Sequence, residues 1–467
     1  MSAHGNNVLL SFLRQNGPTS SARLVEHFEI SRATLSRRVR SLGDAIVTIG
    51  KGRTTQLAAR HENTKGPIPL YQISEKGLAE PFGNLTALQE GSTMRWFLES
   101  DICPHLLLKG EFEKGLFPGW PWFLEDLRPS GFLGQAFSKR MARLFQMDEN
   151  ADRWNDLELI NCLIGFGSNL QGNFLLGDQS ALQEFHQETI DIADGYYRNE
   201  ISKFYPLLAH RAITEGEKYG SSAGGEQQKF TTMVCDHPEQ SPRAVIVKFS
   251  PKLDTASGRR WADLLRSEQI ASQVLNEAGF ATAKSRIFEF EERVFLESER
   301  FDRIGPLGRR GLVSLRSFDA AHLGIGKDWD RCARKMHAGN WISAEDSETM
   351  ICLHCFGSLI ANNDMHLGNL SFFIPKELEP FSLAPIYDML PMFFRPANSG
   401  EIVNRTFEPT LPKPENREIW LKMYPHAVTY WNRVAQAADI SQDFKTIARE
   451  VLVSIKGVHK IAVGNSR

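Results

Sequence analysis

The sequence lacks any run of apolar residues that approaches the roughly 18 needed to cross a membrane. Near its start, Val8 to Leu13 is mostly apolar. This stretch is too short for a secretion signal, and it has neither a basic segment before it nor a small-residue cleavage motif. Cysteine is also scarce, with 6 in 467 residues, which excludes a dense disulfide framework. We therefore expect a cytoplasmic protein with reduced thiols and no membrane partner.

The sequence also lacks a convincing zinc or redox motif. Cys352 and Cys355 have CxxC spacing with His354 between them. A metal site would need two further ligands at comparable spacing, and only His366 lies nearby. We expect these cysteines to be buried residues of a helix.

Basic residues are unevenly distributed along the chain. The net charge is -2, yet residues 1–80 contain eleven Lys or Arg against six Asp or Glu. Within residues 31–60, seven basic residues stand against Asp44 alone. A length of 467 residues exceeds what one hydrophobic core usually organises. These features predict a multidomain globular protein whose N-terminal domain can meet a polyanion.

The N-terminal residues have the pattern of a winged helix-turn-helix domain. Ser20 or Ser21 can cap one helix, and Ser31 can cap the next, which is basic on its outer face. Residues 45–59 are expected to form two strands, and PLYQI at 69–73 is expected to return as a third. We place this domain at residues 1–80 and the following boundary within residues 81–93, where turn residues gather.

Five polar side chains of this domain are candidates for contact with double-stranded DNA. Arg32, Ser36 and Arg37 lie on the second helix of the pair and are candidates for base edges. Lys51 and Arg53 lie at the turn between the two strands and are candidates for the phosphate backbone. A winged domain used for dimerisation or for docking within the chain is the alternative.

Neither a Walker A motif nor GxGxxG is present, but a glycine-containing loop, SSAGGEQQ at 221–228, precedes an expected strand at 229–234. The next strand, expected at 244–249, carries Lys248 after an apolar run, and the helix that follows contains Glu268, a candidate partner for that lysine. Two more strands are expected on either side of Glu291-Glu292. This order of strands and helix is that of a kinase N-lobe.

The stretch NNDMHLGN at 362–369 predicts a loop because its short polar side chains bond nearby backbone. The interval from Asp364 to Asn369 equals the D-x-x-x-x-N interval of a kinase catalytic loop. Asp364 is the candidate base, and Asn369 and Asp388 offer oxygen atoms that suit Mg²⁺. We expect His366 to stabilise the loop by hydrogen bonding rather than to act as a catalyst.

Taken together, GGEQQKF, VIVKFSP, ESERFDR, NNDMHLGNLSFF and APIYDML resemble the HipA-like serine/threonine kinases, of the YjjJ type with an attached DNA-binding domain. The resemblance implies ATP and Mg²⁺ as cofactors and inhibitory autophosphorylation at Ser221 or Ser222. It also implies two groups of nucleotide-site residues. The loop group is Ser222, Ala223, Gly224 and Gly225, and the second group is Lys248, Glu268, the adenine hinge Glu299, Arg300 and Phe301, the ribose contact Asp302, and His366.

The fold class that follows is α+β: the winged domain, then a bilobal HipA-like kinase fold with an N-terminal lobe region at 94–302 and a mostly helical C-terminal lobe at 303–467. The resemblance implies a toxin that phosphorylates a Ser or Thr of a protein, with an aminoacyl-tRNA synthetase as the family's precedent. A homodimer is a candidate assembly. The alternatives are a transcriptional regulator with a catalytically silent, nucleotide-sensing kinase-like part and a small-molecule kinase.

Overall fold

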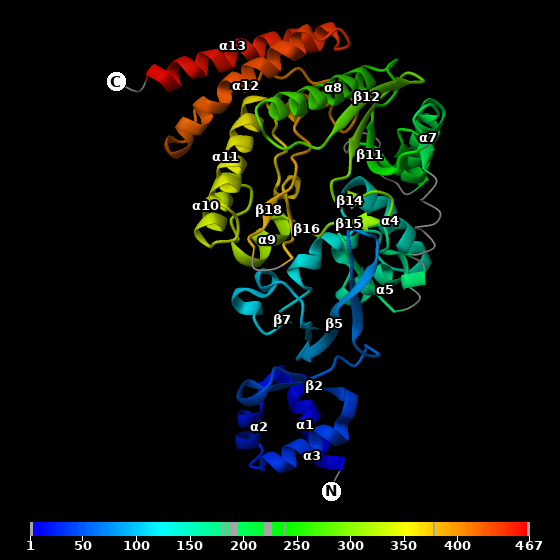
Figure 1. The fold of residues 1–467 in the computed structure, drawn as a ribbon, viewed down its shortest axis with the longest axis vertical. Coiled ribbons are helices and arrows are strands. Elements are labelled where there is room, and N and C mark those ends of the chain that lie inside the picture. The colour runs from blue at the N-terminus through cyan, green and yellow to red at the C-terminus, as the bar shows by residue number, and fades with distance from the viewer. Residues whose placement is uncertain are drawn as a thin grey trace.

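The computed structural model describes residues 3–178, 181–183, 185, 195–218, 227–237, 239–376 and 379–464. The chain is elongated, with the N-terminal domain at one end and the last two helices at the other (Figure 1). No helix of the described residues is both long and apolar enough to cross a lipid bilayer.

The N-terminal domain consists of three helices and a small antiparallel sheet of strand order β1-β3-β2. Both expected caps are present, because the Ser20 hydroxyl accepts the Arg23 N–H and the Ser31 hydroxyl accepts the Thr34 N–H. Leu24 and Leu35 are buried in its core. The elements are α1 (Ala3–Asn16), β1 (Thr19–Ser20), α2 (Ser21–His27), α3 (Arg32–Leu42), β2 (Ile46–Ile49) and β3 (Gln56–Ala59).

The sequence-based placement of PLYQI was wrong. This segment is β4 (Ile68–Ile73), which pairs with β5 (Ala79–Glu90) and β8 (Phe174–Leu176), whereas β1 is the third strand of the N-terminal sheet. The expected boundary at 81–93 lies mostly inside β5. Its Gly83 does not mark a turn: a Cβ at this position would lie 2.5 Å from the carbonyl oxygen of Glu99, so the neighbouring strand requires glycine.

The middle region is built on a five-stranded antiparallel sheet of order β7-β6-β5-β4-β8. Many of its aromatic residues are buried, and Trp96 and Phe123 are almost inaccessible to solvent. The main-chain N–H of His61 donates to Ala87, and Ile49 and Ala58 pack on Leu88, so the N-terminal domain is attached to this sheet. The remaining elements are β6 (Thr93–Glu99), β7 (Leu116–Phe117), α4 (Gly131–Phe145) and α5 (Asp156–Phe166).

A second five-stranded sheet, of order β12-β13-β11-β10-β9, forms the N-lobe. The expected strands and the helix between them are all present. Helix α8 contacts this sheet on the side of Lys248, and α7 packs on the opposite face. The elements are β9 (Tyr196–Tyr197), α7 (Ile201–Lys218), β10 (Lys229–Cys235), β11 (Arg243–Phe249), α8 (Ala256–Glu277), β12 (Ser285–Phe290) and β13 (Arg293–Glu299).

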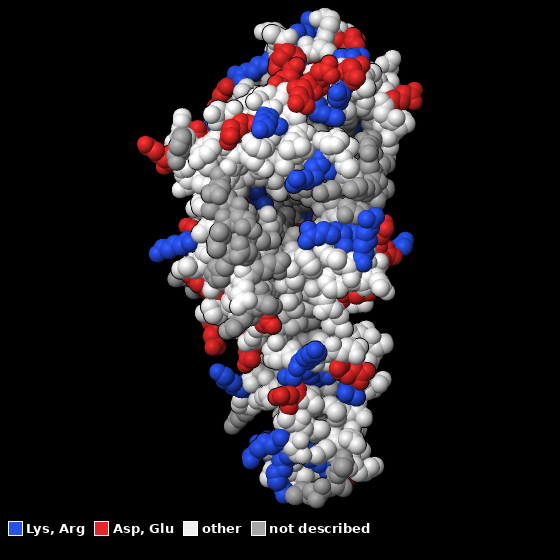
Figure 2. All heavy atoms as spheres, turned by 90° about the vertical axis from the view of Figure 1, so that its right-hand side faces the viewer, with Lys and Arg blue, Asp and Glu red and all other residues white. Residues whose placement is uncertain are grey.

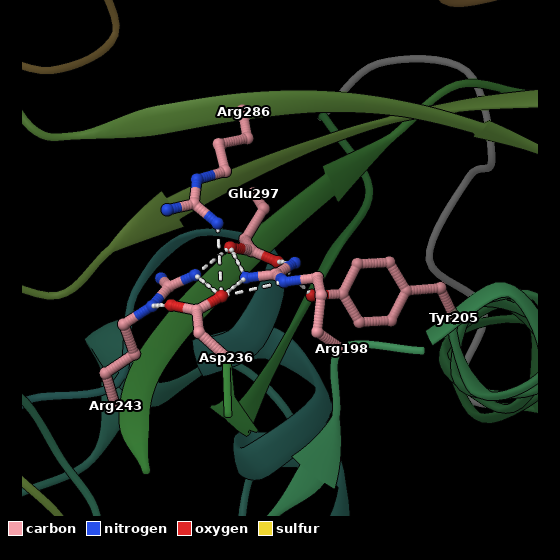
Figure 3. Close-up of polar contacts among 6 residues, drawn as sticks. All are labelled: Arg198, Tyr205, Asp236, Arg243, Arg286 and Glu297. Atoms are coloured by element: carbon pink, nitrogen blue, oxygen red, sulfur yellow. Dashed lines mark hydrogen bonds and ion pairs between the residues drawn. The ribbon is translucent and has the colours of Figure 1, made fainter. Parts of the chain in front are cut away.

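An ion-pair cluster joins α7 to the sheet. Arg198 donates to Asp236 at 2.6 Å and to Glu297 at 2.7 Å, and Arg243 donates to the same carboxylates at 2.8 Å and 2.6 Å. The Tyr205 hydroxyl of α7 donates to Glu297 as well. Because Glu297 pairs with Val247 across the strands, the cluster lies on the opposite face of the sheet from Lys248. Figure 3 shows its members, which are Arg198, Tyr205, Asp236, Arg243, Arg286 and Glu297.

The C-terminal lobe is mostly helical, as expected. Helix α11 carries Cys352 and Cys355, which are buried free thiols as the sequence indicated. The short strands of this lobe form a β14-β15 pair and a β16-β17-β18 sheet. The bounds are β14 (Arg303–Ile304), β15 (Gly308–Arg309), β16 (Leu312–Ser314), α9 (Leu315–His322), α10 (Trp329–Ala338), α11 (Ala344–Leu359), β17 (Ser371–Phe373), β18 (Ser382–Leu383), α12 (Arg417–Gln436) and α13 (Gln442–Gly464).

Candidate active site

Two adjoining cavities lie where the N-lobe sheet meets the loops of the C-terminal lobe. The larger has a volume of about 330 Å³ and the smaller about 180 Å³. Lys229, Lys248 and Asp388 line both. Asp364 and Asn369 line the larger cavity only, and the residues expected to bind adenine line the smaller one. The fold therefore brings the two distant sequence motifs, from β11 and from the loop after α11, to one place.

Lys248 is the central cation of the junction between the cavities. Its ammonium lies 2.6 Å and 2.7 Å from the two carboxylate oxygens of Glu268 and also contacts Asp388. Burial alone would lower the pKa of Lys248, but the carboxylates of Asp388 and Glu268 outweigh burial and raise it. The lysine is therefore charged, and it is positioned by α8 as the sequence predicted.

Asp388 has a left-handed backbone conformation, with φ of 55°, which is uncommon for a residue with a side chain. Its neighbour Tyr387 fixes the turn, because its hydroxyl donates to the carbonyl of Gly368 at 2.8 Å. Burial would raise the pKa of Asp388, but Lys248 and Lys229 lower it to about 2. The carboxylate is thus ionised near neutral pH, as a metal ligand must be.

The loop that carries Asp364 is held by its own polar side chains. The Asn362 amide accepts the Asp364 N–H at 3.1 Å and donates to the Asp388 carbonyl at 3.1 Å, so it joins the two loops. Asn369 donates to the Asp364 carbonyl at 2.9 Å, which leaves its side-chain oxygen as the atom suited to a metal. His366 accepts the Gly368 N–H at 3.1 Å, the loop-stabilising contact expected for it.

These donors fit a magnesium ion bound together with a nucleotide. Among the described residues, no group of three or more His, Cys, Asp or Glu side chains forms a complete metal site. Asn369 and Asp388 supply two hard oxygen donors beside the cavity. Mg²⁺ commonly takes one or two protein oxygens and completes its shell with phosphates and water. Asn369 and Asp388 are therefore suited to hold Mg²⁺ together with a nucleotide, and the binding of both stays a prediction.

The smaller cavity is lined in part by aromatic and aliphatic residues. Phe301 lies within 5.7 Å of Tyr387, ring centre to ring centre, and both side chains line it together with Ile246. The hinge is fixed to the sheet, because the Arg300 N–H donates to the carbonyl of Ala244 at 2.9 Å. Glu299 also lines this cavity.

Asp302 lines the same pocket, but its carboxylate already has several partners. It accepts hydrogen bonds from Arg300 at 2.8 Å, from Arg303 at 2.6 Å and from the Gly172 N–H at 3.0 Å. Burial alone would raise the pKa of Asp302, but the positive charges of Arg300 and Arg303 outweigh burial and lower this pKa. Asp302 thus joins the hinge to the middle region, and a contact with ribose stays a prediction.

The candidate phosphate-loop residues lie outside the described residues. They are Ser221, Ser222, Ala223, Gly224 and Gly225. The described part of the segment begins with Gln227, whose amide donates to the Phe249 carbonyl at 2.8 Å. The chain therefore leaves the loop beside the strand that carries Lys248.

Sequence reasoning missed several residues that line the cavities. Gln171 lines the smaller one, and Phe132 and Arg395 line the larger one. Gln171 and Phe132 come from the middle region, where no motif marks them. Asn362 belongs to the polar loop that the sequence predicts, but its contact with the Asp388 carbonyl depends on the fold.

The candidate DNA contacts lie far from these cavities, at the end of the elongated chain. Arg32, Ser36 and Arg37 are exposed on α3, and Lys51 is exposed at the turn after β2. The backbone of Arg53 belongs to the same turn, and its side chain lies outside what is described. Figure 2 shows basic side chains gathered at this lower end of the molecule.

Comparison with known proteins identifies the relatives of this chain. Residues 64–185 match the family model "YjjJ-like toxin, middle domain" and residues 221–458 match "HipA-like C-terminal domain". The chain is 32% identical over 459 residues to Toxin YjjJ of Escherichia coli K12, covering 97% of this chain and 98% of that protein. The chain belongs to the YjjJ-like toxins of the HipA-like family. The resemblance inferred from the motifs is thereby confirmed.

The α+β fold of this YjjJ-like toxin is similar to that of HipA. One similar structure is that of HipA from Shewanella oneidensis MR-1, solved with HipB and operator DNA. Its superposition on this chain has a TM-score of 0.51 at 17% sequence identity, and it covers 85% of this chain and 97% of that HipA chain. A protein described as a putative kinase from Haemophilus influenzae is 23% identical over 229 residues, which is 41% of this chain and 65% of that protein. These relatives support a toxin family with a kinase-like fold.

Proposed function

We propose that this YjjJ-like toxin is an ATP- and Mg²⁺-dependent protein serine/threonine kinase. The observation that carries the proposal is the position of Lys248, between Glu268 and Asp388, beside a cavity that Asp364 and Asn369 also line. A kinase needs a lysine–glutamate pair, a base and metal-binding oxygens within one site, and the two adjoining cavities together have a candidate for each.

In the proposed reaction, Asp364 accepts the proton of a Ser or Thr hydroxyl as that oxygen bonds to the γ-phosphorus of ATP. The bond from the γ-phosphorus to the bridging oxygen breaks, and ADP leaves with that oxygen. Lys248 and Lys229 hold the phosphates at the junction of the cavities, and Phe301 and Ile246 enclose the base. Asn369 and Asp388 would hold Mg²⁺, which neutralises phosphate charge. Positioning and charge neutralisation supply most of the rate acceleration.

The acceptor and the regulation of the kinase are further parts of the proposal. The family precedent makes an aminoacyl-tRNA synthetase the first acceptor to test in the cytoplasm. Ser221 or Ser222 is the proposed site of inhibitory autophosphorylation, and a homodimer is the proposed assembly.

We propose that the N-terminal domain is a winged helix-turn-helix that binds double-stranded DNA. The order of its helices and strands, the basic exposed residues of α3 and the exposed Lys51 support this role. Arg53, at the tip of the same turn, would add a phosphate contact. The Shewanella HipA was solved with HipB and operator DNA. In this chain the attached domain would itself bring the kinase to DNA.

The experiment that tests the kinase proposal uses the purified full chain, labelled ATP, Mg²⁺ and a cell lysate, followed by mapping of the modified residues. We expect label on Ser or Thr of protein, and none with Asp364→Asn or Asp388→Asn. The exposed, remote Asp101→Asn is the matched control and keeps full incorporation. Nucleotide-dependent DNA affinity without any phosphoprotein would favour the silent regulator instead, and a labelled metabolite would favour a small-molecule kinase.

A further inference from the structure

Arg395 lines the larger cavity together with Asp364, Asn369 and Asp388, but it does not line the smaller, base-binding cavity. Its backbone is anchored, because its N–H donates to the Met392 carbonyl at 3.1 Å and its own carbonyl accepts from Arg405 at 3.1 Å. Arg395 is therefore held at the side of the site away from the base pocket.

The guanidinium of Arg395 is only half-buried, and it makes no hydrogen bond or ion pair with any residue that the structure describes. Two other cations of this region, Lys248 and Arg405, differ in this respect. Lys248 is engaged by Glu268 and Asp388. Arg405, which supports the Arg395 backbone, uses its own guanidinium to bind the carbonyls of Phe393 and Arg395. Within the described part of the chain, therefore, no residue occupies the five N–H donors of Arg395.

Position and chemistry together indicate which ligand this is. ATP would enter the cavity from the base pocket, and its phosphates would first meet Lys229 and Lys248, which line both cavities. The acceptor hydroxyl must reach Asp364, so the acceptor occupies the part of the larger cavity that the nucleotide leaves open. A planar guanidinium binds a carboxylate through two parallel hydrogen bonds, which gives geometric selectivity as well as affinity.

We propose that Arg395 is a specificity-determining residue that binds a carboxylate of the acceptor protein beside the phosphorylated hydroxyl. The acceptor sites of this kinase are therefore acidic. This inference rests on the proposed kinase function and adds the chemical class of its substrate.

The test compares peptides in which one serine is flanked by Asp, by Asn or by Lys. For the wild-type chain we expect kcat/KM to be about tenfold higher for the Asp peptide than for the Asn peptide, the size expected of a charge-assisted hydrogen bond at a half-exposed site. Arg395→Gln should bring this ratio close to one, Arg395→Lys should retain part of it, and Arg395→Glu should reverse the preference in favour of the Lys peptide. Arg449→Gln, an exposed arginine on α13, is the control and keeps the wild-type ratio.

A merely structural role for Arg395 would lower activity on all peptides alike and would not reverse any preference. Circular dichroism and ADP binding establish that each variant is folded. Wild-type activity without an acidic preference, or an Arg395→Glu variant that retains the acidic preference, would overturn this inference and leave the kinase intact. Absence of phosphate transfer to every peptide and protein by the wild-type chain would overturn the kinase proposal and this inference with it.

Discussion

The ammonium of Lys248 lies 2.6 Å and 2.7 Å from the two carboxylate oxygens of Glu268, in a contact between β11 and α8 that is almost closed to solvent. Kinases require this pair for nucleotide binding, and in many of them its formation is the regulated step. In this chain the pair is formed, so α8 positions the lysine of the N-lobe.

The first prediction concerns this pair. Glu268→Gln removes a buried charge that compensates Lys248, and breaking such a pair costs about 3 kcal/mol or more. We expect urea denaturation to show a loss of this size and phosphate incorporation to fall with it. Glu277→Gln removes an exposed carboxylate of the same helix whose ion pair with Arg433 lies at the surface, where such pairs contribute little, so both quantities should stay close to wild-type values. Equal stability of Glu268→Gln and the wild type would show that the contact does not hold α8 in place.

A second prediction concerns acid stability and the cluster of Figure 3. Burial raises the pKa of Glu297, but hydrogen bonds from Arg198, Tyr205 and Arg243 outweigh burial and lower it. A carboxyl group with a lowered folded-state pKa contributes stability above its unfolded pKa of about 4.3, and this contribution is lost as the pH falls through the folded value. We expect the wild-type free energy of unfolding to fall steeply below about pH 4.

Glu297→Gln should be less stable than the wild type at neutral pH and should show a shallower loss in acid, as measured by urea denaturation across a pH series. The exposed Glu239→Gln, in the loop between β10 and β11, is the control. A Glu297→Gln curve parallel to the wild type at every pH would mean that the cluster does not account for the acid sensitivity.

A third prediction concerns the metal. Asn369 offers its side-chain oxygen to the cavity while its amide nitrogen holds the Asp364 carbonyl. Asn369→Ala should therefore raise the Mg²⁺ concentration needed for half-maximal phosphate incorporation by about tenfold or more, the usual effect of losing a metal-orienting group. A titration with Mg²⁺ measures this. An unchanged Mg²⁺ concentration for half-maximal incorporation would show that Asn369 does not bind the metal.

A fourth prediction concerns DNA. Replacing Lys51 and Arg53 by Gln should weaken binding to duplex DNA, because both residues lie in the turn after β2 that is expected to contact the phosphate backbone. A plot of the logarithm of the DNA-binding constant against the logarithm of the salt concentration has a negative slope. Each lost phosphate contact should make this slope shallower by about one. Fluorescence anisotropy at several salt concentrations gives both quantities, with the exposed, remote Lys335→Gln as control. Wild-type affinity that does not change with salt would argue against any neutralisation of phosphates by this domain.

Sequence reasoning succeeded where one local pattern determines the structure. The strand that carries Lys248 and the helix that carries Glu268 follow from apolar periodicity, and the D-x-x-x-x-N interval located Asp364 and Asn369. It failed at β5, where Gly83 resembles a turn residue but is required because the Glu99 carbonyl lies so close. Gln171 and Arg395 could not be found, because the cavities they line exist only after distant loops have packed.

The most direct measurement is a crystal structure of the full chain with Mg²⁺ and a non-hydrolysable ATP analogue. We expect the base beside Phe301, the phosphates against Lys229 and Lys248, and one Mg²⁺ bound by Asn369 and Asp388 with Asp364 facing the γ-phosphate. A nucleotide bound elsewhere, or a cavity that stays without nucleotide at saturating concentration, would contradict the account.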